Sequence, residues 1–210
     1  MIIINTIFSI GHSAHDINVF IKLLKKNKIN KILDVRSVPF SKHTPQFNRE
    51  SIKSKLKNED IEYKFMGDVF GARQKDESLY SPEGFLDFDK VRETNKFKDA
   101  VDNIIINEIN KGKSISLMCS EKNPIDCHRT ILVGRAFDNK KVKVEHILTD
   151  GTTISQKEIE EKLLEYYDFP NKKQKSIYDW ENSQNSQETD YINKAYKKRN
   201  KEVNYYLNSN

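Results

Sequence analysis

The segment NTIFSIGHSAHDINVFIKLLKKNKI, residues 5–29, decides the fold of this chain. Its first half is an apolar run of strand length that ends at Gly11, and its second half repeats apolar residues at helical spacing. A second strand-like run, KILDVRSVPF at residues 31–40, follows directly. A strand, a helix and another strand in this order predict a βαβ unit with two parallel strands.

Later segments repeat this alternation. IEYKFM (61–66), SISLMCS (114–120) and KVEHIL (143–148) are predicted strands. KFKDAVDNIIINEINKG (96–112) has helical spacing, and CHRTILVGRAF (127–137) begins another helix. We therefore predict an α/β fold, with a single open, mostly parallel sheet flanked by helices and a C-terminal helical extension.

A length of 210 residues fits one domain and an extension. We expect the α/β domain over residues 1–168, a polar linker over 169–187 and the extension over 188–210. Within the extension we expect a helix at 188–206 that could dock through Tyr191, Ala195 and Tyr206. The composition changes near Pro170, where NKKQKSIYDWENSQNSQ is polar and typical of a linker.

Composition limits the classes of function. The formal net charge of +5 permits binding to phosphate-bearing partners without requiring it. No segment approaches the roughly 18 apolar residues of a membrane-spanning helix, so we expect no membrane partner. The 2 cysteines do not suggest a disulfide framework in a chain of this size. The expected location is cytoplasmic.

Three loops follow predicted parallel strands and should meet at the carboxyl edge of the sheet, where open α/β sheets bind ligands. They are GHS (11–13), DVRSVPFSKH (34–43) and CSEKNPIDCHR (119–129). We expect the functional atoms of His12, Arg36, Cys119 and Arg129 to line one cavity there. The other residues of the first two loops that should face it are Ser13, Asp34 and Ser37.

The third loop contains both cysteines. Cys119 ends a buried strand, where nearby positive charge would make it a nucleophilic thiolate, although a buried cysteine can equally be a small apolar residue. Glu121 is a candidate acid–base group or an ordinary exposed carboxylate. His12 follows the first strand and is a candidate base, donor or ligand. The catalytic candidates are thus Cys119, Glu121 and His12.

Cys127, His128 and Arg129 stand where the next helix is expected to begin. Backbone amides and the positive end of the helix dipole favour an anion there, and Arg129 could bind it through two hydrogen bonds. The alternative is a structural turn in which Asp126 caps the helix and Arg129 pairs with Glu121.

A zinc site is less well supported by the sequence. The two cysteines, His12 and His128 suffice in number, but the interval between the cysteines exceeds the usual two to four residues. Adjacent Cys127 and His128 would also point apart on a helix. We therefore expect no metal and no cofactor. The remaining histidines are expected in loops or at the surface: His15, His43 and His146.

In this order, five segments resemble the bacterial and archaeal domain-of-unknown-function family 488. They are TIFSIGHS, ILDVRSVPFSKHTPQFN, IEYKFMGDVFGAR, LMCSEKNPIDCHR and VEHIL, and INKAYKKRNKEVNYY is similar to the closing segment of longer members. Members more often carry a double-glycine turn where this chain has DVFGAR. The resemblance implies a site made of the catalytic candidates together with Ser13, Asp34, Arg36, Ser37, Cys127, His128 and Arg129 as ligand-binding residues. Arg73, in the segment that departs from the family pattern, is a further ligand-binding candidate.

The family's activity is not established, so several hypotheses remain. The first is an enzyme acting on a phosphate-containing substrate, a nucleotide or nucleic acid, through thiol or carboxylate chemistry. The second is a non-catalytic module that binds the same ligands. A third is a sulfurtransferase, because rhodanese-like domains also combine a DVR strand with a cysteine that ends a later strand. The ten positions from Cys119 to Arg129, interrupted by Pro124, weaken that similarity.

Overall fold

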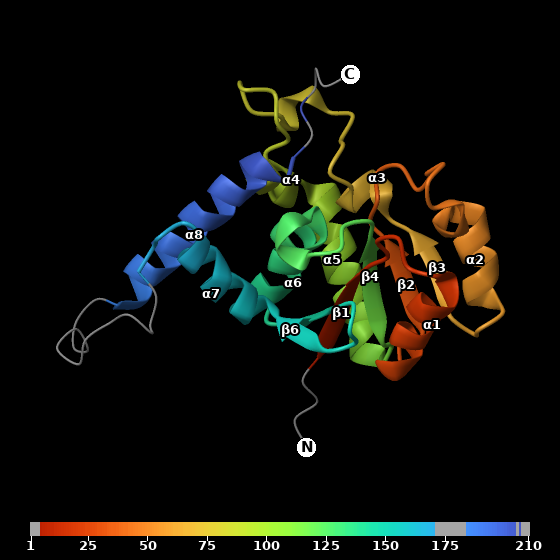
Figure 1. Ribbon diagram of the computed structural model, residues 1–210. Coiled ribbons are helices and arrows are strands. Elements are labelled where there is room, and N and C mark those ends of the chain that lie inside the picture. The colour runs from red at the N-terminus through yellow and green to blue at the C-terminus, as the bar shows by residue number, and fades with distance from the viewer. Residues whose placement is uncertain (1–4, 171–183, 205, 207–210) are drawn as a thin grey trace.

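The computed structural model describes residues 5–170, 184–204 and 206. Within these ranges a 6-stranded sheet has the order β3-β2-β4-β1-β5-β6 (Figure 1). Neighbouring strands pair in parallel except β5 and β6, which are antiparallel. The predicted α/β fold with a mostly parallel sheet is confirmed. The strands are β1 (Thr6–Gly11), β2 (Lys31–Asp34), β3 (Glu62–Phe65), β4 (Ile115–Cys119), β5 (Lys143–Ile147) and β6 (Thr153–Ser155).

Helices connect and cover these strands. Two short turns matter for the site: η4 (Pro124–Asp126) and a π-helical turn, η5 (Arg129–Gly134), which continues into α6. No helix in the described ranges combines the length and the apolar character needed to cross a bilayer. The helices are α1 (Ile17–Lys26), α2 (Arg49–Lys57), α3 (Gly67–Phe70), α4 (Phe88–Glu93), α5 (Asn95–Asn107), α6 (Arg135–Asn139), α7 (Gln156–Tyr166) and α8 (Gln184–Glu202).

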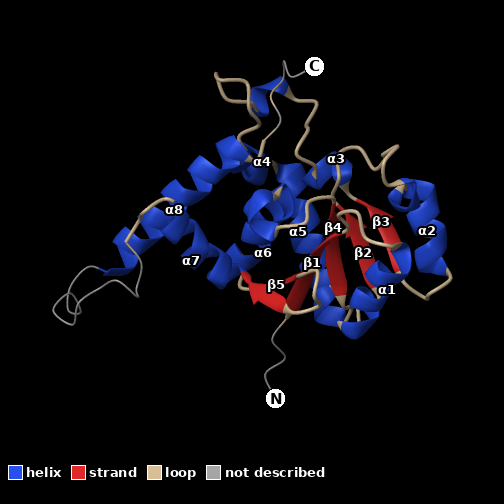
Figure 2. Cartoon of the chain, viewed as in Figure 1, coloured by secondary structure: helices blue, strands red, loops and turns tan. Residues whose placement is uncertain are grey.

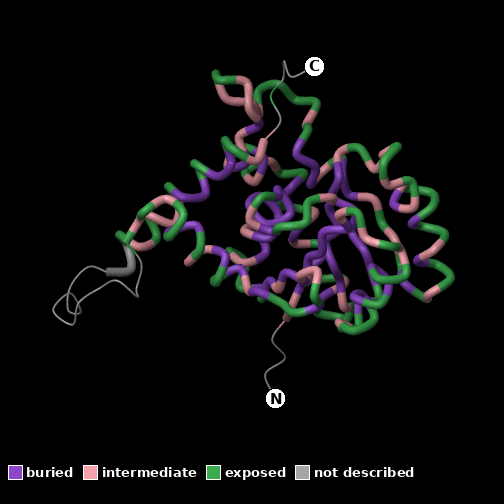
Figure 3. The backbone as a smooth tube through the Cα atoms, viewed as in Figure 1, coloured by how far each residue is buried: buried purple, intermediate pink, exposed green. Residues whose placement is uncertain are grey.

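The core lies in two layers, one on each face of the sheet (Figures 2 and 3). Successive strand residues point to opposite faces, so one strand serves both layers. In β4, Met118 packs in the layer that contains α1 and α2. Leu117 and Cys119 pack in the other layer, with α4 to α8. The side chain that ends β4 is therefore directed toward the α5 and η5 side of the molecule.

The start of α1 differs from its expected form. Ser13 and Asp16 resemble a capping box in sequence. In the structure Ser13 adopts a left-handed backbone with φ 48°, and Asp16 itself caps the helix by accepting from the Asn18 amide at 2.8 Å. Ser13 thus belongs to the loop that turns away from β1.

The C-terminal helix is confirmed, with shifted bounds. Helix α8 begins at Gln184, inside the predicted linker, and ends at Glu202. Residues 171–183, the centre of that linker, lie outside the described residues. Ala195 and Tyr196 are buried in the larger core layer, and Tyr191 stacks on Phe169. The helix therefore packs against the same core as the sheet.

Candidate functional site

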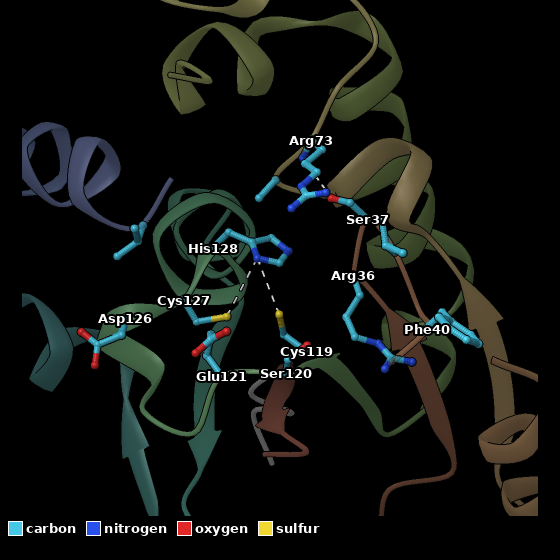
Figure 4. A pocket seen from close by; sticks show the side chains of 13 residues that line it. Arg36, Ser37, Phe40, Arg73, Cys119, Ser120, Glu121, Asp126, Cys127 and His128 are labelled. Atoms are coloured by element: carbon cyan, nitrogen blue, oxygen red, sulfur yellow. Dashed lines mark hydrogen bonds between the residues drawn. The ribbon is translucent and has the colours of Figure 1, made fainter. Parts of the chain in front are cut away.

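The carboxyl ends of β1, β2 and β4 meet at one edge of the sheet. The His12 amide donates to the Cys119 carbonyl at 2.8 Å, and the Val35 amide donates to the Met118 carbonyl at 3.0 Å. These bonds fix the loops around a cavity of ≈ 380 Å³ (Figure 4). Its lining residues are Arg36, Ser37, Val38, Phe40, Ala72, Arg73, Cys119, Ser120, Glu121, Asp126, Cys127, His128 and Val203.

Cys119, Cys127 and His128 form a buried cluster in the wall of this cavity. The Nδ1 atom of His128 lies 3.6 Å from Cys119 Sγ and 3.9 Å from Cys127 Sγ (Figure 4). The three groups all lie within 4.8 Å of one another. His128 Nε2 donates to the Val35 carbonyl at 2.9 Å, so the Nδ1 lone pair of the neutral ring faces the two sulfurs.

The local backbone explains this convergence. Cys119 is the last residue of β4. Cys127 lies between η4 and η5 in an extended conformation, with φ −134° and ψ 138°, and η5 begins only at Arg129. Cys127 and His128 therefore do not share a regular helix. The expectation that they point apart is wrong, because the extended residue before the helix turns both side chains toward Cys119.

The pKa values of the three groups in the cluster are shifted in different directions. Burial opposes ionisation of Cys127, but the hydrogen bond with Cys119 and the charge of Arg129 hold the pKa of the Cys127 thiol well below its usual range. The same hydrogen bond, together with burial, raises the pKa of the Cys119 thiol. Burial of His128 is outweighed by its hydrogen bond to Cys127, which raises the imidazole pKa. The arrangement therefore favours ionisation of Cys127 over ionisation of Cys119.

Asp34 and Arg36 form a buried ion pair beside the cavity. Arg36 Nε donates to Asp34 Oδ1 at 2.9 Å and Nη2 donates to Oδ2 at 2.6 Å. Arg36 Nη1 donates to His12 Nε2 at 3.1 Å, and His12 Nδ1 donates to the Ser13 carbonyl at 2.7 Å. Burial and the charge of Arg36 lower the pKa of His12 to about 4. His12 is therefore neutral near pH 7 and orients Arg36, since both of its ring nitrogens are engaged.

Arg129 is buried beneath the third loop (119–129) and binds backbone carbonyls of that loop. It is 0% exposed and does not line the cavity. Its guanidinium donates to the Glu121 carbonyl at 2.6 Å and to the Lys122 carbonyl at 3.4 Å. Gly11 leaves room for this turn, because a Cβ there would lie 1.8 Å from the Glu121 carbonyl oxygen. The expectation that Arg129 reaches the cavity is wrong: the turn folds its backbone carbonyls around the buried cation.

The structure thus brings together most, but not all, of the residues predicted for the site. Seven line the cavity: Arg36, Ser37, Arg73, Cys119, Glu121, Cys127 and His128. Four do not: His12, Ser13, Asp34 and Arg129.

Sequence reasoning did not predict some of the residues that line the cavity. Val38 and Phe40 line the cavity and are 58% and 62% exposed. The two apolar residues on either side of Pro39 in a loop are the sequence feature that could have indicated this apolar surface. Val203 joins the cavity from just beyond α8, a contact that no sequence pattern announces.

Residues 16–136 match the family model described as "Domain of unknown function DUF488". The match spans more than half of the chain and includes every cavity residue except Val203. The chain belongs to the DUF488 family. No curated protein and no solved structure matches it. The DUF488 match leaves out His12, α7 and α8, so the tail that contributes Val203 lies beyond the matched residues.

A further histidine of this DUF488 protein differs from its expected place. His146 was expected in a loop or at the surface, but it is a buried residue of β5. Its Nδ1 lies 2.7 Å from Ser9 Oγ, and its Nε2 lies 2.8 Å from Gln156 Oε1. His15 is half-buried and His43 is exposed, as expected.

Proposed function

We propose that this protein is an enzyme that acts on a phosphate-containing substrate, a nucleotide or a nucleic acid, in the cavity at the carboxyl edge of the sheet. One observation carries the proposal: the thiol–imidazole cluster lines the same cavity as Arg36 and Arg73. Thiols and imidazole supply nucleophilic and proton-transfer chemistry. Guanidinium groups are the preferred partners of phosphate oxygens.

The cavity suits a ligand with an anionic part and a planar part. Its volume of ≈ 380 Å³ falls in the range of small-molecule sites. Exposed Phe40 offers a surface for a nucleobase, and such stacking contributes about 1–3 kcal/mol. Ser37 Oγ accepts from the Arg73 amide at 2.9 Å, which leaves its hydroxyl proton to donate to a ligand oxygen.

Other features support the same proposal. Glu121 lines the cavity beside the cluster and is our candidate for the acid–base group. The net charge of +5 favours encounter with polyanionic partners. Both cysteines are free thiols, which persist in a reducing compartment, and we therefore propose a cytoplasmic location.

Binding and turnover of a nucleotide panel test this proposal. We expect Arg73→Ala to weaken the binding of a nucleotide by about ten- to a hundredfold, the effect of losing a charge-assisted hydrogen bond. Arg73→Lys should recover part of the affinity, because it keeps the charge without the planar fork. Lys113→Ala is the matched control, since Lys113 lies at the opposite, amino end of β4. Isothermal titration calorimetry measures the affinities.

Turnover separates an enzyme from a binding module. Cys119→Ser and Glu121→Gln should retain nucleotide binding and lose product formation, followed by chromatography of the reaction mixture. Binding without turnover in the unmodified protein would favour the non-catalytic module. Affinity for nucleotides that is the same in Arg73→Ala and Lys113→Ala would contradict the proposed ligand class.

A further inference from the structure

We propose that Cys119, Cys127 and His128 form a Zn²⁺ site whose fourth position opens into the cavity. The three side chains supply two sulfurs and one imidazole nitrogen, all within 4.8 Å of one another. Two cysteines and a histidine with an open position form a known type of catalytic zinc site. The zinc site rests on its own geometry, and only the role of its open position rests on the proposed function.

The nitrogen–sulfur distances match the edges of a tetrahedron around zinc. Zinc binds sulfur at about 2.3 Å and nitrogen at about 2.0–2.1 Å, so a tetrahedral angle places sulfur and nitrogen about 3.6 Å apart. His128 Nδ1 lies 3.6 Å from Cys119 Sγ and 3.9 Å from Cys127 Sγ. Both nitrogen–sulfur distances are therefore within a few tenths of an ångström of this value. The two sulfurs lie within 4.8 Å of each other and would move to about 3.8 Å apart around an ion.

The hydrogen bond on the far side of His128 has the form that metal sites require. Metal-bound histidines almost always donate their second ring nitrogen to a carbonyl or a carboxylate, which fixes the tautomer and the ring orientation. His128 Nε2 donates to the Val35 carbonyl at 2.9 Å. This bond keeps the proton on Nε2 and directs the Nδ1 lone pair at the two sulfurs.

The donor set selects the ion. Thiolate and imidazole ligands suit zinc, whereas magnesium and calcium prefer oxygen donors. Binding replaces the proton on each thiol by the ion and releases these protons to solvent, while His128 binds as neutral imidazole. Two thiolates neutralise the charge of Zn²⁺, so the buried centre carries no net charge.

The three residues line the cavity, so the remaining coordination position faces the space where the substrate is proposed to bind (Figure 4). A zinc ion with an open position can polarise a phosphoryl or carbonyl oxygen or activate water. The sulfurs then serve as metal ligands, and Glu121 serves as the acid–base group beside them.

Metal analysis of the purified, untagged protein tests the site directly. We expect one zinc per chain by plasma mass spectrometry after dialysis with Zn²⁺. Replacement by Co²⁺ should give a thiolate-to-cobalt charge-transfer band and the intense visible bands of tetrahedral cobalt. Zinc far below one per chain, together with the spectrum of octahedral cobalt, would overturn the proposal. Recovery of a Cys119–Cys127 disulfide in place of the metal would do the same.

Variants locate the ligands. Cys127→Ser and His128→Asn should lose zinc and the cobalt charge-transfer band, while Arg73→Ala, in the same cavity, should retain both. Circular dichroism verifies that each variant is folded, and the metal content of the unmodified protein decides the matter if the ligand variants do not fold. Zinc retained at one per chain by folded Cys127→Ser would overturn the assignment.

The two proposals fail separately. One zinc per chain in a protein that binds no nucleotide would contradict the proposed function and leave the metal site standing. Nucleotide binding and turnover by a protein that takes up no zinc would contradict the metal site alone.

Discussion

His128 and His146 are both buried, and each has hydrogen-bond partners for both ring nitrogens, yet they belong to different kinds of region. His146 lies in a continuous chain of polar groups. Its ring accepts from the Ser9 hydroxyl and donates to Gln156 Oε1. Gln156 Nε2 donates to the Tyr196 hydroxyl at 2.6 Å, which donates to Glu160 Oε1 at 3.1 Å. We call this set of five residues the tail network.

Each donor in the tail network meets an acceptor, which keeps His146 neutral. Burial and the charge of Arg129 lower the pKa of this imidazole to about 3. A satisfied buried network rigidifies the structure and leaves no lone pair for a ligand. The tail network connects β1 and β5 to α7 and α8, so its role is to dock the C-terminal helix.

The cluster of Cys119, Cys127 and His128 differs in the direction of its lone pairs. Two sulfurs and the Nδ1 nitrogen lie within 4.8 Å of one another in the wall of a cavity. Convergent electron pairs repel one another unless a proton or a cation lies between them. Burial alone therefore does not distinguish a structural histidine from a functional one. The distinction comes from the groups that face its second ring nitrogen.

The largest expected effect comes from the tail network. Tyr196→Ala should lower the free energy of unfolding by about 3–5 kcal/mol, the range for truncation of a buried aromatic residue. Tyr196→Phe should lower it by about 1–3 kcal/mol, because the Gln156 amide loses its acceptor. Urea denaturation followed by circular dichroism measures both.

Arg73→Ala is the matched control from the cavity and should change stability by less than about 0.5 kcal/mol, since Arg73 is exposed. Equal stability of Tyr196→Ala and Arg73→Ala would show that α8 does not belong to the core. The contrast between a structural and a functional region would then fail.

The two regions meet at Arg199 of α8. Its Nε donates to the Ile125 carbonyl at 3.1 Å, and its Nη2 pairs with Asp126. Asp126 immediately precedes Cys127 and lines the cavity. Helix α8 therefore supports the turn that positions one of the two sulfurs.

Arg199→Ala is expected to have an intermediate effect on stability and also to lower the affinity of the Cys119, Cys127 and His128 cluster for zinc. Loss of charge-assisted hydrogen bonds should lower the free energy of unfolding by about 1.5–3 kcal/mol. Because the turn before Cys127 is released, zinc affinity should fall by about tenfold, as for loss of an outer-sphere partner. Competition with a chromophoric chelator measures the affinity. Lys197→Ala, exposed on the same helix, should change neither quantity, and unchanged zinc affinity in Arg199→Ala would show that the regions are independent.

Periodicity was sufficient to predict most of the fold. The apolar run before Gly11 and the helical spacing after it correspond to β1 and α1, and the alternation along the chain predicts the parallel sheet. Strand β6 escaped prediction because a three-residue edge strand is determined by pairing with β5 and not by its own composition. The start of α8 was missed because Gln184 lies in a polar segment without an apolar pattern.

The site was predictable only to the level of loops. Residues that follow parallel strands do meet at one edge, but the loop sequence does not say which side chains face the cavity. Arg129 turned inward because backbone carbonyls enclose it, and Cys127 and His128 converge because one residue is extended. The burial of His146 could have been predicted from the sequence. His146 follows apolar Val144 by two residues in β5, so both side chains point to the same, buried face of the sheet.

Glu160 is the one end of the tail network that titrates in the neutral range. Burial and the charge of Asp138 raise the pKa of this carboxyl to about 7, although the Tyr196 hydroxyl and Arg135 oppose the shift and Glu188 adds to it. A carboxyl whose pKa is higher in the folded state favours folding when it is protonated. Its contribution is therefore complete below the unfolded value of 4.5 and is lost as the pH rises to about 7.

Glu160→Gln should remove this pH dependence and has the smallest effect of the three. At pH 8 the variant should be more stable than the unmodified protein by about 1–2 kcal/mol, after allowance for solvent around a half-buried group. At pH 4 the two proteins should be equally stable, because Glu160 is then protonated in both states. Urea denaturation at a series of pH values measures the difference, with Glu165→Gln, exposed on the same helix, as the control. The difference in free energy of unfolding between Glu160→Gln and the unmodified protein could instead be the same at pH 4 and pH 8. That result would show that folding does not change the pKa of Glu160, and the tail network would then end at Tyr196.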